Sequence, residues 1–80
     1  MALVNTIEPI STTSNRKHDP VHRCTWTSLR SHDGTQLLQL DTYGTKGRQN
    51  SDQPSQKIQL TEESARLLLK AIRQTFPMLG

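Results

Sequence analysis

The feature that most constrains the fold of this 80-residue chain is an amphipathic segment near its C-terminus, residues 61–77. Thr61 is a suitable N-cap, two glutamates follow it where the helix dipole favours carboxylates, and Pro77 is a typical helix stop. Apolar residues recur at the spacing of one helical face: Ala65, Leu68, Leu69, Ile72 and Phe76, flanked by Leu67 and Ala71. We therefore predict a C-terminal helix with one broad apolar face.

Two segments before this helix have the pattern of strands, residues 21–30 and 36–43. The pair Asp33-Gly34 between them is a strong hairpin signal, because turn residues there must tolerate positive φ. Alternation places Cys24, Trp26 and Ser28 on one side of the first strand. Its other side carries Arg23, Thr25, Thr27 and Leu29. We predict that these two strands form an antiparallel hairpin.

Residues 44–56 contain no large apolar side chain apart from proline, so we interpret them as a mobile, basic-tipped loop in which a further short strand can lie. Residues 57–60 alternate again and predict a strand with Ile58 and Leu60 inward. The predicted fold class is therefore α+β. It consists of a small antiparallel sheet of three or four strands and one C-terminal amphipathic helix, in the order β-β-(β)-β-α.

The N-terminal residues 1–20 are rich in Ser, Thr, Asn and Pro and show no apolar period. Such a composition cannot offset the entropy of ordering, so we predict a flexible tail there. The single small domain is expected at residues 21–77, and residues 78–80 form the C-terminal end.

The predicted core is thin, because hydrophobic residues make up 31% of the chain and aromatic residues 4%. In a domain of about 60 ordered residues, apolar burial at ~25 cal/mol/Å² barely exceeds the cost of ordering. The apolar face of the helix is also broader than one small sheet would cover. We therefore expect a homodimer with Leu68, Leu69 and Ile72 at the contact.

No residues of the chain have the spacing of a catalytic, metal or nucleotide site. The three histidines and Cys24 match no zinc spacing, and a cysteine in mid-strand is typical of a buried, inert thiol. Asp33 and Asp41 lack a further acidic pair, and the glycines of the polar loop do not form a phosphate-binding loop. We expect no enzymatic activity, no metal and no cofactor.

The chain also lacks a run of about 18 to 20 apolar residues, so we expect no membrane partner. Its one cysteine cannot form an intramolecular disulfide, which favours a reducing compartment. We expect a soluble, cytoplasmic protein. The net charge of +3 and the pI near 9.5 mildly favour an anionic partner.

Single-stranded nucleic acid is bound by cations that track phosphates and by rings on which bases stack. Residues of these types lie on the predicted strands and loop, and the candidate contacts are Arg23, Arg30, Tyr43, Lys46, Arg48 and Lys57. A solvated surface is the alternative interpretation of the cations. Trp26 is either a core residue under the helix, which we favour, or a stacking platform. The basic residues of the helix are interpreted as an ordinary exposed face; they are Arg66, Lys70 and Arg73.

The strand end LLQLDTYG, the polar basic loop and the text QKIQLTEESARLLLKAI together resemble the positive cofactor four family of transcription coactivators, over residues 36–75. In that family a β-β-β-β-α domain dimerises through its C-terminal helix, and curved sheets bind single-stranded DNA. The resemblance implies that Lys57 faces the DNA, that Lys46 and Arg48 lie on the connecting loop, and that the three helix residues named above form the dimer contact. The chain departs from the family at RQNSDQPSQ, a polar segment with a proline that stands where the family has a third strand. The short sequences DTYG, RQ, SQ and IQL are also similar to those of short uncharacterised bacterial proteins.

Two hypotheses follow. The first is a non-enzymatic module that binds single-stranded DNA or RNA as a homodimer, with a role in transcription regulation. The alternative is a protein interaction module, a small regulator or inhibitor that docks through its sheet edge or helix face. Cations that converge on one face of the sheet would favour the first, whereas scattered cations and an exposed Trp26 would favour the second.

Overall fold

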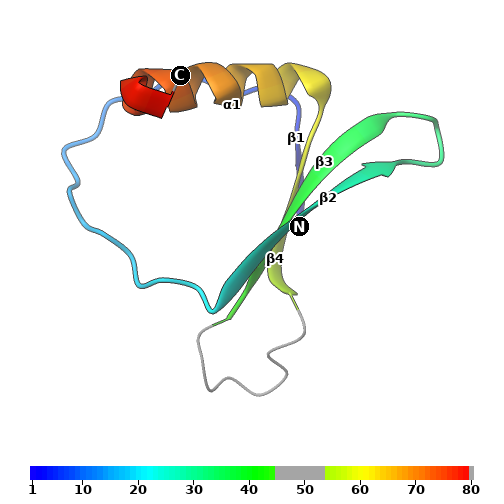
Figure 1. Ribbon diagram of the computed structural model, residues 1–80, viewed down its shortest axis with the longest axis horizontal. Helices are drawn as coiled ribbons and strands as arrows, with labels where there is room; N and C mark the ends of the chain where they lie inside the picture. Colours follow the sequence, from blue (N-terminus) through cyan, green and yellow to red (C-terminus); the bar gives the residue numbers. More distant parts are fainter. Residues whose placement is uncertain (45–53, 80) are drawn as a thin grey trace.

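The computed structural model describes residues 1–44 and 54–79 of the chain. Its elements are β1 (Ala2–Val4), β2 (Arg23–Arg30), β3 (Gln36–Tyr43), β4 (Pro54–Leu60), α1 (Glu62–Thr75) and the short 3-10 helix η1 (Pro77–Leu79). The strands form one sheet in the order β1-β4-β3-β2, and α1 lies to one side of it (Figure 1). The predicted fold class is confirmed: it is α+β, with a small sheet followed by one C-terminal helix.

The hairpin of β2 and β3 has the predicted antiparallel register, from Arg23 opposite Tyr43 to Arg30 opposite Gln36. β3 begins and ends at the predicted residues. The strands are joined by residues 31–35, in which Ser31 N donates to Thr35 O at 2.9 Å and Gly34 N donates to Ser31 O at 3.0 Å. Gly34 has a φ of 88°, in the left-handed region that glycine adopts without a steric penalty. The Asp33-Gly34 signal therefore predicted the hairpin correctly.

The strand β4 pairs with β3 in antiparallel fashion and begins at Pro54, before the predicted start at residue 57. A register shift between Thr42 and Tyr43 interrupts this pairing near the start of β4. Bulges of this kind bend a strand, and a proline is tolerated at a strand's first residue. Residues 45–53, the centre of the predicted loop, lie outside the described residues.

The strand β1 lies within residues 1–20, for which the composition predicts a flexible tail. It pairs in parallel with β4, with Ala2 opposite Ile58 and Val4 opposite Leu60. The sheet is therefore mixed, which corrects the prediction of an antiparallel sheet. A three-residue strand is too short to show a period of two, and its pairing depends on a partner more than 50 residues away, so local sequence carries no signal for it.

The segment 5–22 connects the two opposite edge strands, β1 and β2. It passes α1 and then returns to the start of β2 (Figure 1). Along this connecting segment every residue is exposed except Ile7, which is half-buried. Ile7 and Pro9 line a pocket with Leu67 and Ala71 of the helix, so the first part of the connecting segment lies against the middle of α1.

The helix α1 begins and ends as predicted. Thr61 is the N-cap, and a capping box forms because Thr61 N donates to Ser64 Oγ at 2.9 Å while Ser64 N donates to Thr61 Oγ1 at 3.3 Å. Ser64 is fully buried. Phe76 is the C-cap, and Pro77 begins η1. Within the described residues, no helix combines the length and the apolar character that a bilayer crossing requires.

The apolar core of the described residues is small. Its buried apolar side chains are Leu37, Tyr43 and Leu60. The accessible surface of the chain is 7255 Å², whereas a compact 9.1 kDa monomer exposes about 4,900 Å². Its radius of gyration is 14.8 Å, against about 12 Å for a compact chain of this length. The exposed connecting segment accounts for part of this surplus, and the uncovered apolar surface described below adds to it.

Candidate functional site

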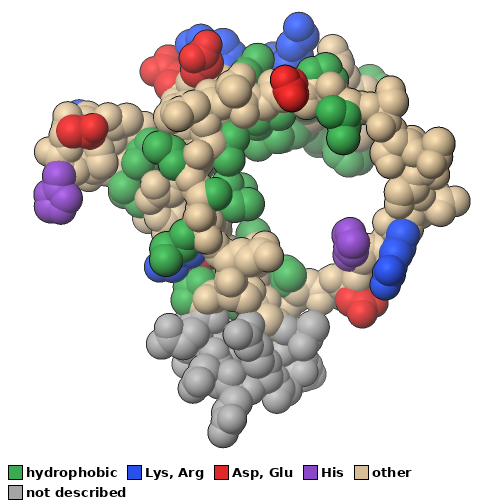
Figure 2. Space-filling model, turned by 180° about the vertical axis from the view of Figure 1, so that it is seen from behind, with side chains coloured by type: hydrophobic (Ala, Val, Ile, Leu, Met, Phe, Trp, Pro, Cys, Tyr) green, Lys and Arg blue, Asp and Glu red, His purple; other side chains and the backbone are tan. Residues whose placement is uncertain are grey.

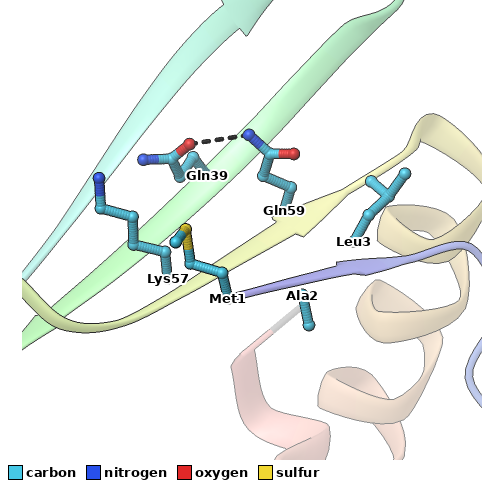
Figure 3. A pocket seen from close by; sticks show the side chains of 6 residues that line it. All are labelled: Met1, Ala2, Leu3, Gln39, Lys57 and Gln59. Atoms are coloured by element: carbon cyan, nitrogen blue, oxygen red, sulfur yellow. Dashed lines mark hydrogen bonds between the residues drawn. The ribbon is translucent and has the colours of Figure 1, made fainter.

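The register divides the sheet into two faces of different character. The apolar face, defined by Trp26, Leu38, Leu40, Ile58 and Leu60, is the side on which α1 lies, since Leu38 and Leu60 line one pocket together with Ala65 of the helix. The opposite face, called the polar face, carries Arg23, Thr25, Thr27, Gln39, Asp41, Tyr43, Lys57 and Gln59, and toward the hairpin loop it carries the apolar pair Leu29 and Leu37. Figure 3 shows Gln39, Lys57 and Gln59 pointing to the side of the sheet opposite α1. The helix therefore does not cover these three side chains, which are half-buried, while Leu37 and Tyr43 on the same face are buried.

Three of the six predicted nucleic-acid contacts lie together on the polar face. Arg23 and Tyr43 are opposite one another in the register, and the Arg23 guanidinium carbon lies 4.9 Å from the centroid of the Tyr43 ring. The Tyr43 hydroxyl is 3.4 Å from Thr25 Oγ1. Tyr43 is only 9% exposed, so the group presented to solvent is the guanidinium stacked on it rather than the ring. Lys57 is the third residue, from the neighbouring strand β4.

The remaining predicted contacts do not join this group in the described structure. Arg30 alternates with Arg23 along β2 and so belongs to the other side of the sheet, where its Nη1 donates to Gly34 O at 3.1 Å. Arg30 therefore secures the hairpin loop instead of extending the cationic surface. Lys46 and Arg48 lie outside the described residues.

A chain of side-chain hydrogen bonds crosses the polar face beside Lys57. Gln59 Nε2 donates to Gln39 Oε1 at 2.9 Å, and Gln39 Nε2 donates to the two carboxylate oxygens of Asp41 at 3.0 and 3.3 Å. Lys57 lies opposite Asp41 in the register, so it flanks this chain. Neither glutamine is among the residues predicted to bind nucleic acid. Their signal was the repeated pattern of one glutamine between two apolar residues, LQL in β3 and IQL in β4.

The amide pair lies in a pocket of about 350 Å³. Its lining consists of Met1, Ala2, Leu3, Gln39, Lys57 and Gln59 (Figure 3). Met1 and Leu3 form the apolar wall of the pocket at the β1 edge of the sheet, and both residues are exposed, Met1 completely. It thus combines a cation, two amides and an apolar wall in one concavity.

The apolar face is only partly covered, although α1 lies on its side of the sheet. Trp26 is 69% exposed, and Ile58 on β4 is also exposed. Figure 2 shows an open hollow between the sheet, the helix and the connecting segment, with hydrophobic side chains along the part formed by the sheet and the helix. The interpretation of Trp26 as a core residue under the helix is therefore wrong for the single chain, because α1 does not reach it.

The three residues predicted to form the dimer contact differ in their exposure to solvent. Leu68 and Ile72 are half-buried, whereas Leu69 is 46% exposed and Phe76 at the C-cap is 58% exposed. The predicted helical face thus divides into a half-buried part and an outer part that contacts solvent.

No three His, Cys, Asp or Glu side chains among residues 1–44 and 54–79 lie close enough to hold a metal. Cys24 is exposed, which corrects its interpretation as a buried thiol. Asp33 accepts hydrogen bonds from the Ser31 hydroxyl and from Thr35 N, and these bonds lower the pKa of its carboxyl group. That carboxylate stabilises the hairpin loop and lies away from the polar-face pocket.

Comparison of the chain with known protein families, with curated proteins and with solved structures gave no match.

Proposed function

We propose that this chain is a non-enzymatic binding module that holds single-stranded DNA or RNA on the polar face of its sheet and acts as a homodimer. One observation carries the proposal. Arg23 and Lys57 stand on the face opposite α1 together with the Gln39–Gln59 amide pair, so cations and hydrogen-bonding groups share one surface. Such a surface suits a strand whose phosphates and bases are both exposed.

Electrostatics sets the expected strength of this binding. On the polar face, Arg23 and Lys57 accompany one carboxylate, that of Asp41, so the excess of positive charge per chain is small. Each neutralised phosphate releases counterions, and affinity from this source falls as salt rises. The module should therefore bind weakly as a single chain, and more strongly when two copies present their polar faces to one strand.

The homodimer is proposed because the single chain exposes more surface than a compact monomer of its mass. A stable interface buries about 1,200 to 2,000 Å² in total, and the exposed apolar side chains of the sheet and of α1 are candidates to supply it. The apolar face and the outer part of α1 would be the surfaces covered, with Leu69 and Trp26 near the contact and Leu68 and Ile72 beneath. Burying them leaves the polar face free for the nucleic acid.

A protein interaction module is the second candidate, and the exposure of Trp26 together with the separate position of Arg30 favours it. A large exposed aromatic side chain in an apolar surface is typical of a protein contact. In this alternative a different protein covers the apolar face, and the polar face is only a solvated surface. A second copy of the chain accounts for the same exposed tryptophan without a further partner.

The two candidates are separated by a titration of the full chain into a fluorescent single-stranded oligonucleotide and, in parallel, into its duplex, over a series of salt concentrations. We expect binding to the single strand that weakens linearly in log salt, and weaker binding to the duplex. Light scattering on the same samples should give the mass of a dimer. A protein that is dimeric or bound to a protein partner, yet binds no oligonucleotide even at low salt, would favour the interaction module.

A further inference from the structure

The hydrogen-bond chain on the polar face fixes the orientation of both glutamine amides. An ionised carboxylate only accepts hydrogen bonds, so Gln39 must turn its NH₂ group toward Asp41. The carbonyl oxygen of Gln39 then faces Gln59, and Gln59 must in turn offer its own NH₂ group. Asp41 therefore determines which atoms of Gln59 remain available.

The remaining atoms of Gln59 are one acceptor and one donor. Its Nε2 carries two hydrogens and the bond to Gln39 uses one, which leaves the second N–H beside Oε1. An adjacent donor and acceptor in a planar amide complement the Watson–Crick edge of a nucleobase, on which an acceptor and a donor also stand side by side. The Watson–Crick edges of bases are occupied in a duplex and free in a single strand.

The surroundings of Gln59 suit a base joined to a phosphate backbone. Met1 and Leu3 form an apolar wall of the pocket, while the Lys57 ammonium extends along the same face (Figure 3). The pocket volume of about 350 Å³ is within the range of about 300 to 1,000 Å³ typical of small-molecule sites. A flat heterocycle can thus lie against the wall with its edge toward Gln59 and its phosphate near Lys57.

We propose that this pocket is a subsite for one unpaired nucleobase, with Gln59 as the residue that binds the base edge and Asp41 as a positioning residue that acts through Gln39. The inference rests on the proposed function and deepens it, because it assigns the preference for single strands to a particular side chain. A base in a duplex cannot present the edge that Gln59 binds.

The test compares two labelled strands of equal length, an oligothymidine and an abasic strand with the same backbone. Thymine offers O4 as an acceptor beside N3–H as a donor, which matches the free N–H and Oε1 of Gln59. The quantity measured is the ratio of the Kd for the abasic strand to the Kd for oligothymidine. For Gln59→Ala we expect this ratio to fall about tenfold, the effect of losing one bidentate contact. Binding of the abasic strand should be unchanged.

The matched control is Gln56→Ala, since Gln56 is a glutamine of the same strand whose position in the register belongs to the opposite face. It should leave the ratio unchanged. Asp41→Asn provides a second variant of nearly the same shape. Asparagine can donate as well as accept, so the two orientations of the amide chain become similar in population. About half of the molecules then present Gln59 in the binding orientation, and the ratio should fall about twofold. The lost charge affects both strands alike and cancels in the ratio.

The outcomes distinguish failure of the nucleobase subsite from failure of nucleic-acid binding as a whole. Suppose that the unmodified protein binds both strands and that Gln59→Ala and Asp41→Asn each give the same ratio as the unmodified protein. The subsite is then overturned, while nucleic-acid binding remains. If the unmodified protein binds neither strand at low salt, the proposed function fails and the subsite with it. Circular dichroism identifies a variant that does not fold; should Gln59→Ala be one, the Asp41→Asn ratio alone decides.

Discussion

Trp26 of β2 lies directly opposite Leu40 of β3 on the apolar face, yet the indole is 69% exposed. In a folded monomer such a pair is normally covered by the element packed on that face. Here α1 contacts the sheet around Leu38 and Leu60, at the other end of the same face. The part of the apolar face around Trp26 is therefore not covered by α1. This uncovered part is the structural reason to expect that a second copy of the chain packs there.

We predict that Trp26→Ala weakens dimerisation without unfolding the chain. A tryptophan at the centre of an interface typically contributes about 2 kcal/mol or more, which corresponds to a roughly 30-fold rise in the dimer dissociation constant. Sedimentation at several protein concentrations measures that constant, and far-UV circular dichroism reports the fold.

The control is Trp26→Phe, which keeps an aromatic ring and should retain most of the association. A well-folded monomer of the unmodified chain at high micromolar concentration would contradict the dimer. If Trp26→Ala instead melts the sheet at every concentration, the side chain belongs to the core of one chain and the exposed position is wrong.

A second prediction concerns β1, the edge strand whose three residues pair with β4. Deleting residues 1–4 removes the half-buried Val4 and three register pairs, so the thermal midpoint should fall. A loss of about 1 kcal/mol corresponds to about 4 to 8 °C for a domain of this size. Calorimetry measures the shift. Replacing residues 11–14, which are exposed, by four alanines is the matched control and should leave the midpoint nearly unchanged.

The hairpin loop supplies a prediction of pH dependence. Hydrogen bonds from the Ser31 hydroxyl and from Thr35 lower the pKa of the Asp33 carboxyl below its ordinary value of 3.8. Because the folded-state pKa is the lower one, the stabilisation is present above the unfolded-state value and is lost as pH falls through the folded-state value. The thermal midpoint of Asp33→Asn should therefore vary less below about pH 4 than that of the unmodified chain.

Thermal scans at closely spaced pH values test this dependence. The control is Asp19→Asn, a change at an exposed acid of the connecting segment, which should leave the acidic limb of the profile in place. Parallel profiles for the unmodified chain and Asp33→Asn would show that the loop hydrogen bonds contribute nothing to the acid response.

The sequence predicted those parts of the fold whose signals are local. Thr61, the two glutamates after it and Pro77 bound the helix correctly, and alternation across residues 36–43 gave the bounds of β3. The pairing of β1 with β4 spans most of the chain, so no local pattern could reveal it. The hydrophobic character of Trp26 predicted burial, but burial depends on where α1 lies, which is a property of the assembled sheet.

The site was only partly predictable for the same reason. Basic and aromatic residue types pointed to Arg23, Tyr43 and Lys57, which alternation and pairing bring to one face. Alternation could also have separated Arg30 from Arg23, since the two are an odd number of residues apart on β2. The amide pair required the register of β3 against β4, because Gln39 and Gln59 meet only when those strands pair as observed.

The last prediction tests the cationic surface itself. Joint substitution Arg23→Ala and Lys57→Ala should lower affinity for single strands of every sequence, because phosphate contacts carry no sequence information. The slope of log K against log salt should flatten by about 0.7 for each lost contact with a single strand. The matched control is Lys70→Ala with Arg73→Ala, two exposed cations of α1, which removes equal charge elsewhere and should change the slope little. Equal loss in both double variants would mean that net charge alone drives binding, and the polar face would then have no special role.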